Sequence, residues 1–176
     1  AVLKEGLYED AERKEALLDL CRFTTNESED PISLSQYLEK MPDTQKDIYY
    51  ISAETSAQAL ASPHLEGFKS KNVPVLIMTD AIDQFWLPMI GSFKEKKFTS
   101  ITQGKINLDE LDAKSKNKDK DKKENKEKQD KEFVDLIAQL KIVLGDQVKD
   151  IRLSSKLTDS PVCLVADEGD MDIAME

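Results

Sequence analysis

The chain has 176 residues and a formal charge of -10, so it can form one domain or two small ones and lacks the positive charge that nucleic-acid or anionic-membrane binding requires. No apolar run approaches the roughly 20 residues that span a bilayer, and we expect no secretory leader. Cys21 and Cys163 stand far apart without a CxxC pair, which argues against a disulfide framework or a zinc site and favours a reducing cytoplasm.

The first part of the chain predicts two helices separated by a loop. Apolar positions within residues 1–23, among them Leu17 and Leu20, predict one amphipathic helix with a buried stripe. Residues 24–31 are polar and acidic and predict the loop. Ser33 predicts the start of the second helix, because Gln36 stands three positions later and completes a capping box.

Two short apolar runs, residues 48–51 and 75–78, organise the chain. Both are rich in β-branched and aromatic residues, and helix signals separate them, so they predict parallel strands joined by a helical crossover. Ser52 is predicted to cap a first crossover helix and Ser62 a second. With a short third strand over residues 98–102, the pattern predicts an α/β fold: a small three-layer α/β/α module with a βαβ core.

A lysine-rich charged segment follows and divides the chain. It offers nothing apolar to bury, so it predicts a solvated linker or an exposed helix, with a binding patch for an acidic partner as the alternative. We therefore expect three parts: an α/β module over residues 1–112, a helical charged linker over 113–130, and a further module over 131–176.

The last part predicts a truncated α+β module. Apolar residues recur at helical spacing from Phe133 to Leu144 and predict a helix. Asp130 before it is the expected cap, and Gly145 after it is the expected terminator. Residues 148–153 and 161–166 then predict two strands.

Candidate chemistry is sparse. The glycines form no phosphate-binding loop, and the sole histidine, His64, is more simply explained as a polar residue at a helix start. Asp80 and Asp83 follow the second strand, where open α/β sheets place ligands, and could hold Mg²⁺ for phosphoryl transfer or hydrolysis. The alternative, which we favour, is that they stabilise the first turn of a helix.

The helix that starts near Asp83 carries apolar residues on nearly every side. Phe85, Trp86 and Met89 have the composition of an adaptable binding surface, and the same composition also suits a core. Core packing is the favoured interpretation for Phe85, whereas core packing and partner contact both stay open for Trp86.

Several blocks of this sequence resemble, in order and spacing, the ATP-dependent ninety-kilodalton heat-shock chaperones of the bacterial HtpG type. They are residues 34–41, 45–51, 62–66, 75–83, 144–153 and 157–166. The resemblance implies that residues 1–112 end the chaperone's middle segment and that residues 131–176 begin its C-terminal domain. The alanine at the first position and the abrupt end also indicate a piece of a longer protein.

The resemblance also implies a division of labour. ATP and Mg²⁺ would bind other domains of a full-length cytoplasmic ATPase that acts in the stress response and forms a homodimer, while this fragment would hold no cofactor or metal and catalyse nothing. In the family, the helix after the second βαβ strand belongs to the surface that holds non-native client proteins. Gln84, Phe85, Trp86 and Met89 are therefore the candidate client contacts, although Gln84 replaces a common acidic residue.

Overall fold

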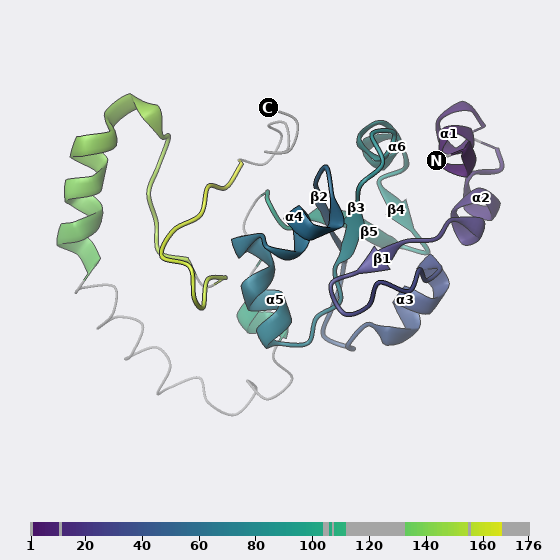
Figure 1. Ribbon diagram of the computed structural model, residues 1–176, viewed down its shortest axis with the longest axis horizontal. Helices are drawn as coiled ribbons and strands as arrows, with labels where there is room; N and C mark the ends of the chain where they lie inside the picture. The colour runs from purple at the N-terminus through teal and green to yellow at the C-terminus, as the bar shows by residue number, and fades with distance from the viewer. Residues whose placement is uncertain are drawn as a thin grey trace.

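A five-stranded sheet with the order β1-β3-β2-β5-β4 forms the centre of the molecule (Figure 1). The computed structural model describes residues 2–10, 12–103, 106, 108–111, 133–154 and 156–166. The strands are β1 (Thr24–Thr25), β2 (Ile48–Ser52), β3 (Leu76–Met78), β4 (Ser92–Phe93) and β5 (Lys96–Ser100). The three central strands, β3, β2 and β5, are parallel, and β1 and β4 pair antiparallel at the edges. The predicted βαβ core is confirmed.

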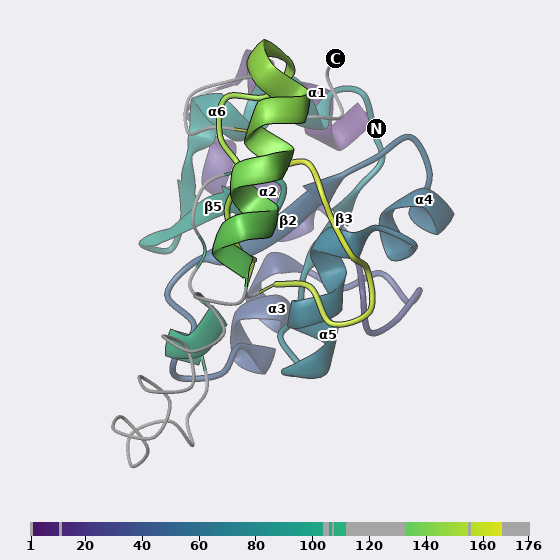
Figure 2. The ribbon, with the colours of Figure 1, turned by 90° about the vertical axis from the view of Figure 1, so that its left-hand side faces the viewer.

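Helices cover both faces of this sheet, as Figures 1 and 2 show, which confirms the three-layer prediction. One layer contains α1 (Val2–Glu9), α2 (Lys14–Leu20), α3 (Leu34–Lys40) and α6 (Asp83–Ile90). The other contains α4 (Ser56–Leu60), the 3-10 turns η1 (Pro63–Leu65) and η2 (Leu108–Leu111), and α5 (Glu66–Ser70). None of the helices in the described part of the chain is long and apolar enough to cross a bilayer.

Strand β3 and most of β2 are buried on both faces because their residues are apolar at successive positions. Side chains of a strand point alternately to opposite faces. Leu76 and Met78 accordingly pack under α1, α2, α3 and α6, whereas Ile77 packs under α4 and α5. Each fully buried side chain of this size contributes about 1.5–3 kcal/mol relative to exposure. Burial of these strand side chains therefore stabilises the packing of both helical layers on the sheet.

The crossover between β2 and β3 follows local signals, with one correction. The expected cap Ser52 ends β2, and Thr55 caps α4 instead, because its side chain accepts a hydrogen bond from the backbone N–H of Gln58. Ser62 and Pro63 begin η1 as predicted. The helical pair is therefore present but starts three residues later than the sequence pattern indicates.

Helix α3 begins with the predicted capping box. The Ser33 hydroxyl accepts the Gln36 backbone N–H at 3.1 Å, and the Gln36 side chain accepts the Ser33 backbone N–H at 2.9 Å. One turn later, the buried Tyr37 hydroxyl donates to the carbonyl of Pro74 at 2.7 Å, just before β3. The capping box stabilises the start of α3, and the Tyr37 bond ties the helix to the chain just before β3.

The prediction of one helix over residues 1–23 is wrong, because the segment forms two helices that pack against each other. Asp10 separates them, and its carboxylate accepts the Arg13 backbone N–H at 3.1 Å. Because the helix is interrupted, a different side of α2 faces the core from the one predicted. Leu18 lies in the core, whereas Leu20, which was expected on the buried stripe, is 58% exposed. The loop predicted over residues 24–31 likewise begins with β1, a two-residue strand that is too short to show a periodic pattern.

The C-terminal part departs most from expectation. Residues 133–144 form the predicted helix, which Figure 1 shows apart from the sheet, and Gly145 follows it with a left-handed φ of 50°. The strands predicted over residues 148–153 and 161–166 are wrong, since the described residues form no ladder there beyond one bridge between Gln103 and Ala166. The charged linker and Asp130 lie outside the described residues, and the domain boundaries stay a prediction.

Candidate functional site

Helix α6 lies at the edge of the sheet where the parallel strands β2 and β3 end. It begins at Asp83, shortly after β3, and Gly91 ends it with a left-handed φ of 67°, a conformation that glycine adopts without strain. The carboxyl ends of parallel strands are where open α/β sheets place functional groups. The candidate client contacts and the candidate metal ligands therefore share one short element.

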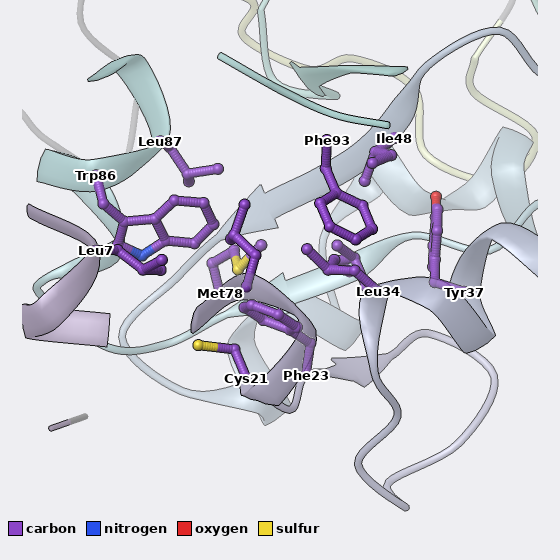
Figure 3. Close-up of a cluster of buried hydrophobic side chains, with 12 residues drawn as sticks. Leu7, Cys21, Phe23, Leu34, Tyr37, Ile48, Met78, Trp86, Leu87 and Phe93 are labelled. Atoms are coloured by element: carbon purple, nitrogen blue, oxygen red, sulfur yellow. The ribbon is translucent and has the colours of Figure 1, made fainter. Parts of the chain in front are cut away.

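The two sides of α6 have opposite environments. Trp86 and Leu87 point into the core beside Leu7 and Met78, as Figure 3 shows. The Trp86 ring packs edge-on against Phe98 at a centroid distance of 5.6 Å.

The outward side of the same helix is apolar as well. Phe85 is 59% exposed and Met89 is 52% exposed, and Gln84 beside them is partly buried. The structure thus removes Trp86 from the candidate client surface, because its side chain is fully buried, and it contradicts core packing for Phe85. The exposed pair, Phe85 and Met89, is called the α6 apolar pair below.

A buried ion pair holds the inner side of α6. The Lys4 ammonium of α1 lies 2.8 and 2.9 Å from the two carboxylate oxygens of Asp83, and Asp83 is 1% exposed. The indole N–H of Trp86 donates to the same carboxylate at 2.8 Å. Since buried charges persist only when they are paired and hydrogen-bonded, this arrangement ties α1, the start of α6 and the core together.

Asp80 completes the cluster from the loop before α6. Its carboxylate lies 2.7 Å from the Lys4 ammonium, and its backbone N–H donates to Asp83 at 3.2 Å. The hydrogen bond from Lys4 lowers the pKa of Asp80, against the opposing effect of partial burial. The cation between the two carboxylates is therefore a lysine side chain, and the geometry does not support a magnesium site. The described residues contain no group of three or more potential metal-ligating side chains.

A depression of about 230 Å³ lies beside this cluster, over the ends of β2 and β3. Three carboxylates line it, those of Glu54, Asp80 and Asp83, together with Met78, Gln84 and several small or hydroxyl-bearing residues. Its carboxylates disfavour a phosphate or nucleotide ligand, which requires backbone N–H groups or cations. The depression supplies no catalytic constellation.

The other candidate nucleophiles and bases are dispersed. His64 is buried in η1, in the helical layer opposite α6. Both cysteines are free, and burial raises the pKa of the Cys21 and Cys163 thiols. A reactive thiol requires the opposite shift, so neither cysteine has the environment of a nucleophile.

Sequence reasoning missed Lys4, the residue that organises the cluster. It is separated from Asp83 by 79 positions, and a single lysine near the start of a chain is normally solvent-exposed. The one available signal is its place three residues before Leu7, which puts both side chains on the same face of α1.

Comparison with known proteins gives a consistent result. The family model described as Hsp90 protein matches residues 1–176. The chaperone protein HtpG of Roseobacter denitrificans is 46% identical over 175 residues, which cover 99% of this chain and 28% of the relative. That of Streptomyces coelicolor is 41% identical over 177 residues, which cover 100% of this chain and 27% of the relative.

A solved structure agrees with the sequence relatives. The middle domain of a Plasmodium falciparum heat shock protein superimposes with a TM-score of 0.53 and 36% identity, over 56% of this chain and 42% of that chain. The chain spans only 28% of the length of the Roseobacter relative. Since the family model covers every residue and the fold agrees with the middle domain, the chain belongs to the Hsp90 protein family.

Proposed function

We propose that this chain is the section of an ATP-driven, homodimeric chaperone that contacts non-native client proteins in the cytoplasm through the α6 apolar pair. The same section would transmit movement between the nucleotide-binding and dimerising ends of the full-length protein. Membership of the Hsp90 family and the chaperone names of the relatives support this role.

The observation that carries the proposal is the contrast between the two sides of α6. Phe85 and Met89 are exposed on a helix whose opposite side is fixed by Trp86 and by the ion pair of Asp83. An aromatic ring and a flexible thioether adapt to many apolar sequences. Because the helix is held rigidly, a client would bind without the entropic cost of ordering the surface.

The carboxylates of the site have a structural role in this proposal. Asp80 and Asp83 both contact the Lys4 ammonium, which supports an ion-pair role for them over the role of an acid, a base or a magnesium ligand. ATP and Mg²⁺ would act elsewhere in the full-length protein. This chain would respond to them by changing its orientation relative to its neighbours, which is a shift between populated arrangements.

The test is a double substitution, Phe85→Ser with Met89→Ser, in the full-length chaperone. We expect it to weaken the suppression of citrate synthase aggregation at elevated temperature and to leave basal ATP turnover unchanged. Leu20→Ser is the matched control, because Leu20 is equally exposed at 58% but lies on α2. Full protection by the double variant, or an equal loss in the control, would contradict the proposal.

A further inference from the structure

The Glu66 carboxylate, at the start of α5, binds a loop that lies more than ninety residues away in sequence. It accepts the backbone N–H of Thr158 at 2.8 Å, of Asp159 at 2.9 Å and of Ser160 at 3.1 Å. The Ser160 hydroxyl donates a further, short hydrogen bond to it. These bonds lower the pKa of Glu66 to about 2, so the carboxylate stays ionised and engaged at neutral pH. Bonds to an ionised acceptor are among the stronger hydrogen bonds in proteins.

The residue next to Glu66 shapes the same contact. A Cβ atom on Gly67 would lie 2.6 Å from the carbonyl oxygen of Lys156 and would also clash with Leu108. The glycine therefore lets the backbone of the loop approach α5 directly. Lys156 is itself buried, and its ammonium donates to the carbonyl of Ile101 at 3.2 Å.

A third contact fixes the far end of this segment. The Ala166 backbone N–H donates to the carbonyl of Thr102 at 3.1 Å, just beyond β5. Between the two ends, Val162 and Leu164 are exposed, so apolar burial contributes little to this attachment. Residues 156–166 are thus held to the α/β module that contains the five-stranded sheet, called the sheet module below. The attachment consists mainly of charge-assisted and backbone hydrogen bonds, which can be exchanged for bonds to water.

We propose that Glu66 is a latch that couples the orientation of the C-terminal part to the sheet module. While its carboxylate binds residues 158–160, the segment over residues 156–166 moves with α5. When the carboxylate withdraws, the bonds of Lys156 and Ala166 are left to hold the segment, and the two parts reorient more freely. The inference rests on the proposed role of this chain as a mechanical coupler, and it names the side chain through which the coupling passes.

The first test is hydrogen exchange in the full-length protein. Glu66→Gln removes the charge and one strong acceptor, so the amides of residues 158–160 should exchange about tenfold faster. Glu39→Gln, on the exposed side of α3, makes the same chemical change and should alter nothing at this loop. Unchanged protection of the Ile77 amide in β3 checks that the sheet remains folded.

The second test measures the coupling itself. Dyes are placed at Gln58 on α4 and at Ile142 in the helix over residues 133–144, both exposed, and single-molecule energy transfer records the distance between them. Glu66→Gln and Gly67→Ala should each broaden the distance distribution, because they release the same loop by different means. A distribution identical to that of the unmodified protein in both variants would overturn the latch. Neither readout involves a client, so a failed latch is distinct from a failed client surface.

Discussion

Replacing Lys4 by methionine would leave the buried carboxylate of Asp83 without its cationic partner. Methionine keeps a similar length and an apolar stem, so the substitution isolates the charge. The two oxygens of Asp83 lie 2.8 and 2.9 Å from the Lys4 ammonium, and Asp83 is 1% exposed. Removing one partner of a buried ion pair costs about 3–5 kcal/mol. The side chain of Asp80 is 39% exposed, so its pairing adds at most about 1 kcal/mol.

We therefore expect Lys4→Met to lower the free energy of unfolding by about 3–5 kcal/mol. Urea denaturation followed by fluorescence measures it, because Trp86 is the sole tryptophan and hydrogen-bonds to Asp83. Adding Asp83→Asn removes the stranded charge but keeps an oxygen acceptor for the indole, so the double variant should recover part of the loss. Lys14→Met, at an exposed lysine of α2, is the control and should change stability by less than about 0.5 kcal/mol.

Two results would refute this reasoning. A loss in Lys4→Met no larger than that in Lys14→Met would mean that Asp83 is solvated, contrary to its burial. A double variant less stable than Lys4→Met would mean that the charge of Asp83 is not what destabilises the single variant.

Further predictions concern α5 and the helix caps. Gly67→Ala should destabilise the chain, although alanine favours a helix over glycine by about 1 kcal/mol, because the added Cβ atom would clash with Leu108 and Lys156. Gly6→Ala should stabilise the chain, because its Cβ atom would lie 3.4 Å from the nearest atom, in Leu17. Urea denaturation of the two variants measures both changes in the free energy of unfolding. Because the pKa of Glu66 falls from 4.5 to about 2 in the folded state, the stabilisation it supplies should be complete above pH 4.5 and disappear as the pH falls through about 2. The free energies of unfolding of Glu66→Gln and of the unmodified chain, measured across this pH range, should therefore become equal in acid. A constant difference between them at every pH would contradict this role of Glu66. Ser33→Ala should cost about 1 kcal/mol by thermal unfolding, and no change would mean that the α3 cap is redundant.

Features that depend on neighbours in sequence were predictable. The capping box of Ser33 requires only Gln36, and the strands β2 and β3 require only a short apolar run between helix signals. The three-layer fold follows from these elements, because a strand apolar at successive positions needs helices on both of its faces.

Features that depend on distant residues were not predictable. The orientation of α6 is one, since a helix that is apolar on nearly every side has no periodicity to mark its inward face, and Phe85 lies on the surface where core packing was expected. The partner of Asp83 is another, because Lys4 reaches it only through the packing of α1 on α6. The prediction of two C-terminal strands was wrong for the same reason, because an apolar run becomes a strand only where another strand pairs with it.

The most direct test of the account is photocrosslinking from the α6 apolar pair in the full-length chaperone. Benzoylphenylalanine replaces Phe85 in one variant and the exposed Gln58 of α4 in another, and reduced, carboxymethylated α-lactalbumin serves as a permanently unfolded client. We predict crosslinks from position 85 and background yield from position 58. Equal yields from both positions, or no crosslink from position 85 while the client is bound, would contradict the claim that this helix contacts clients.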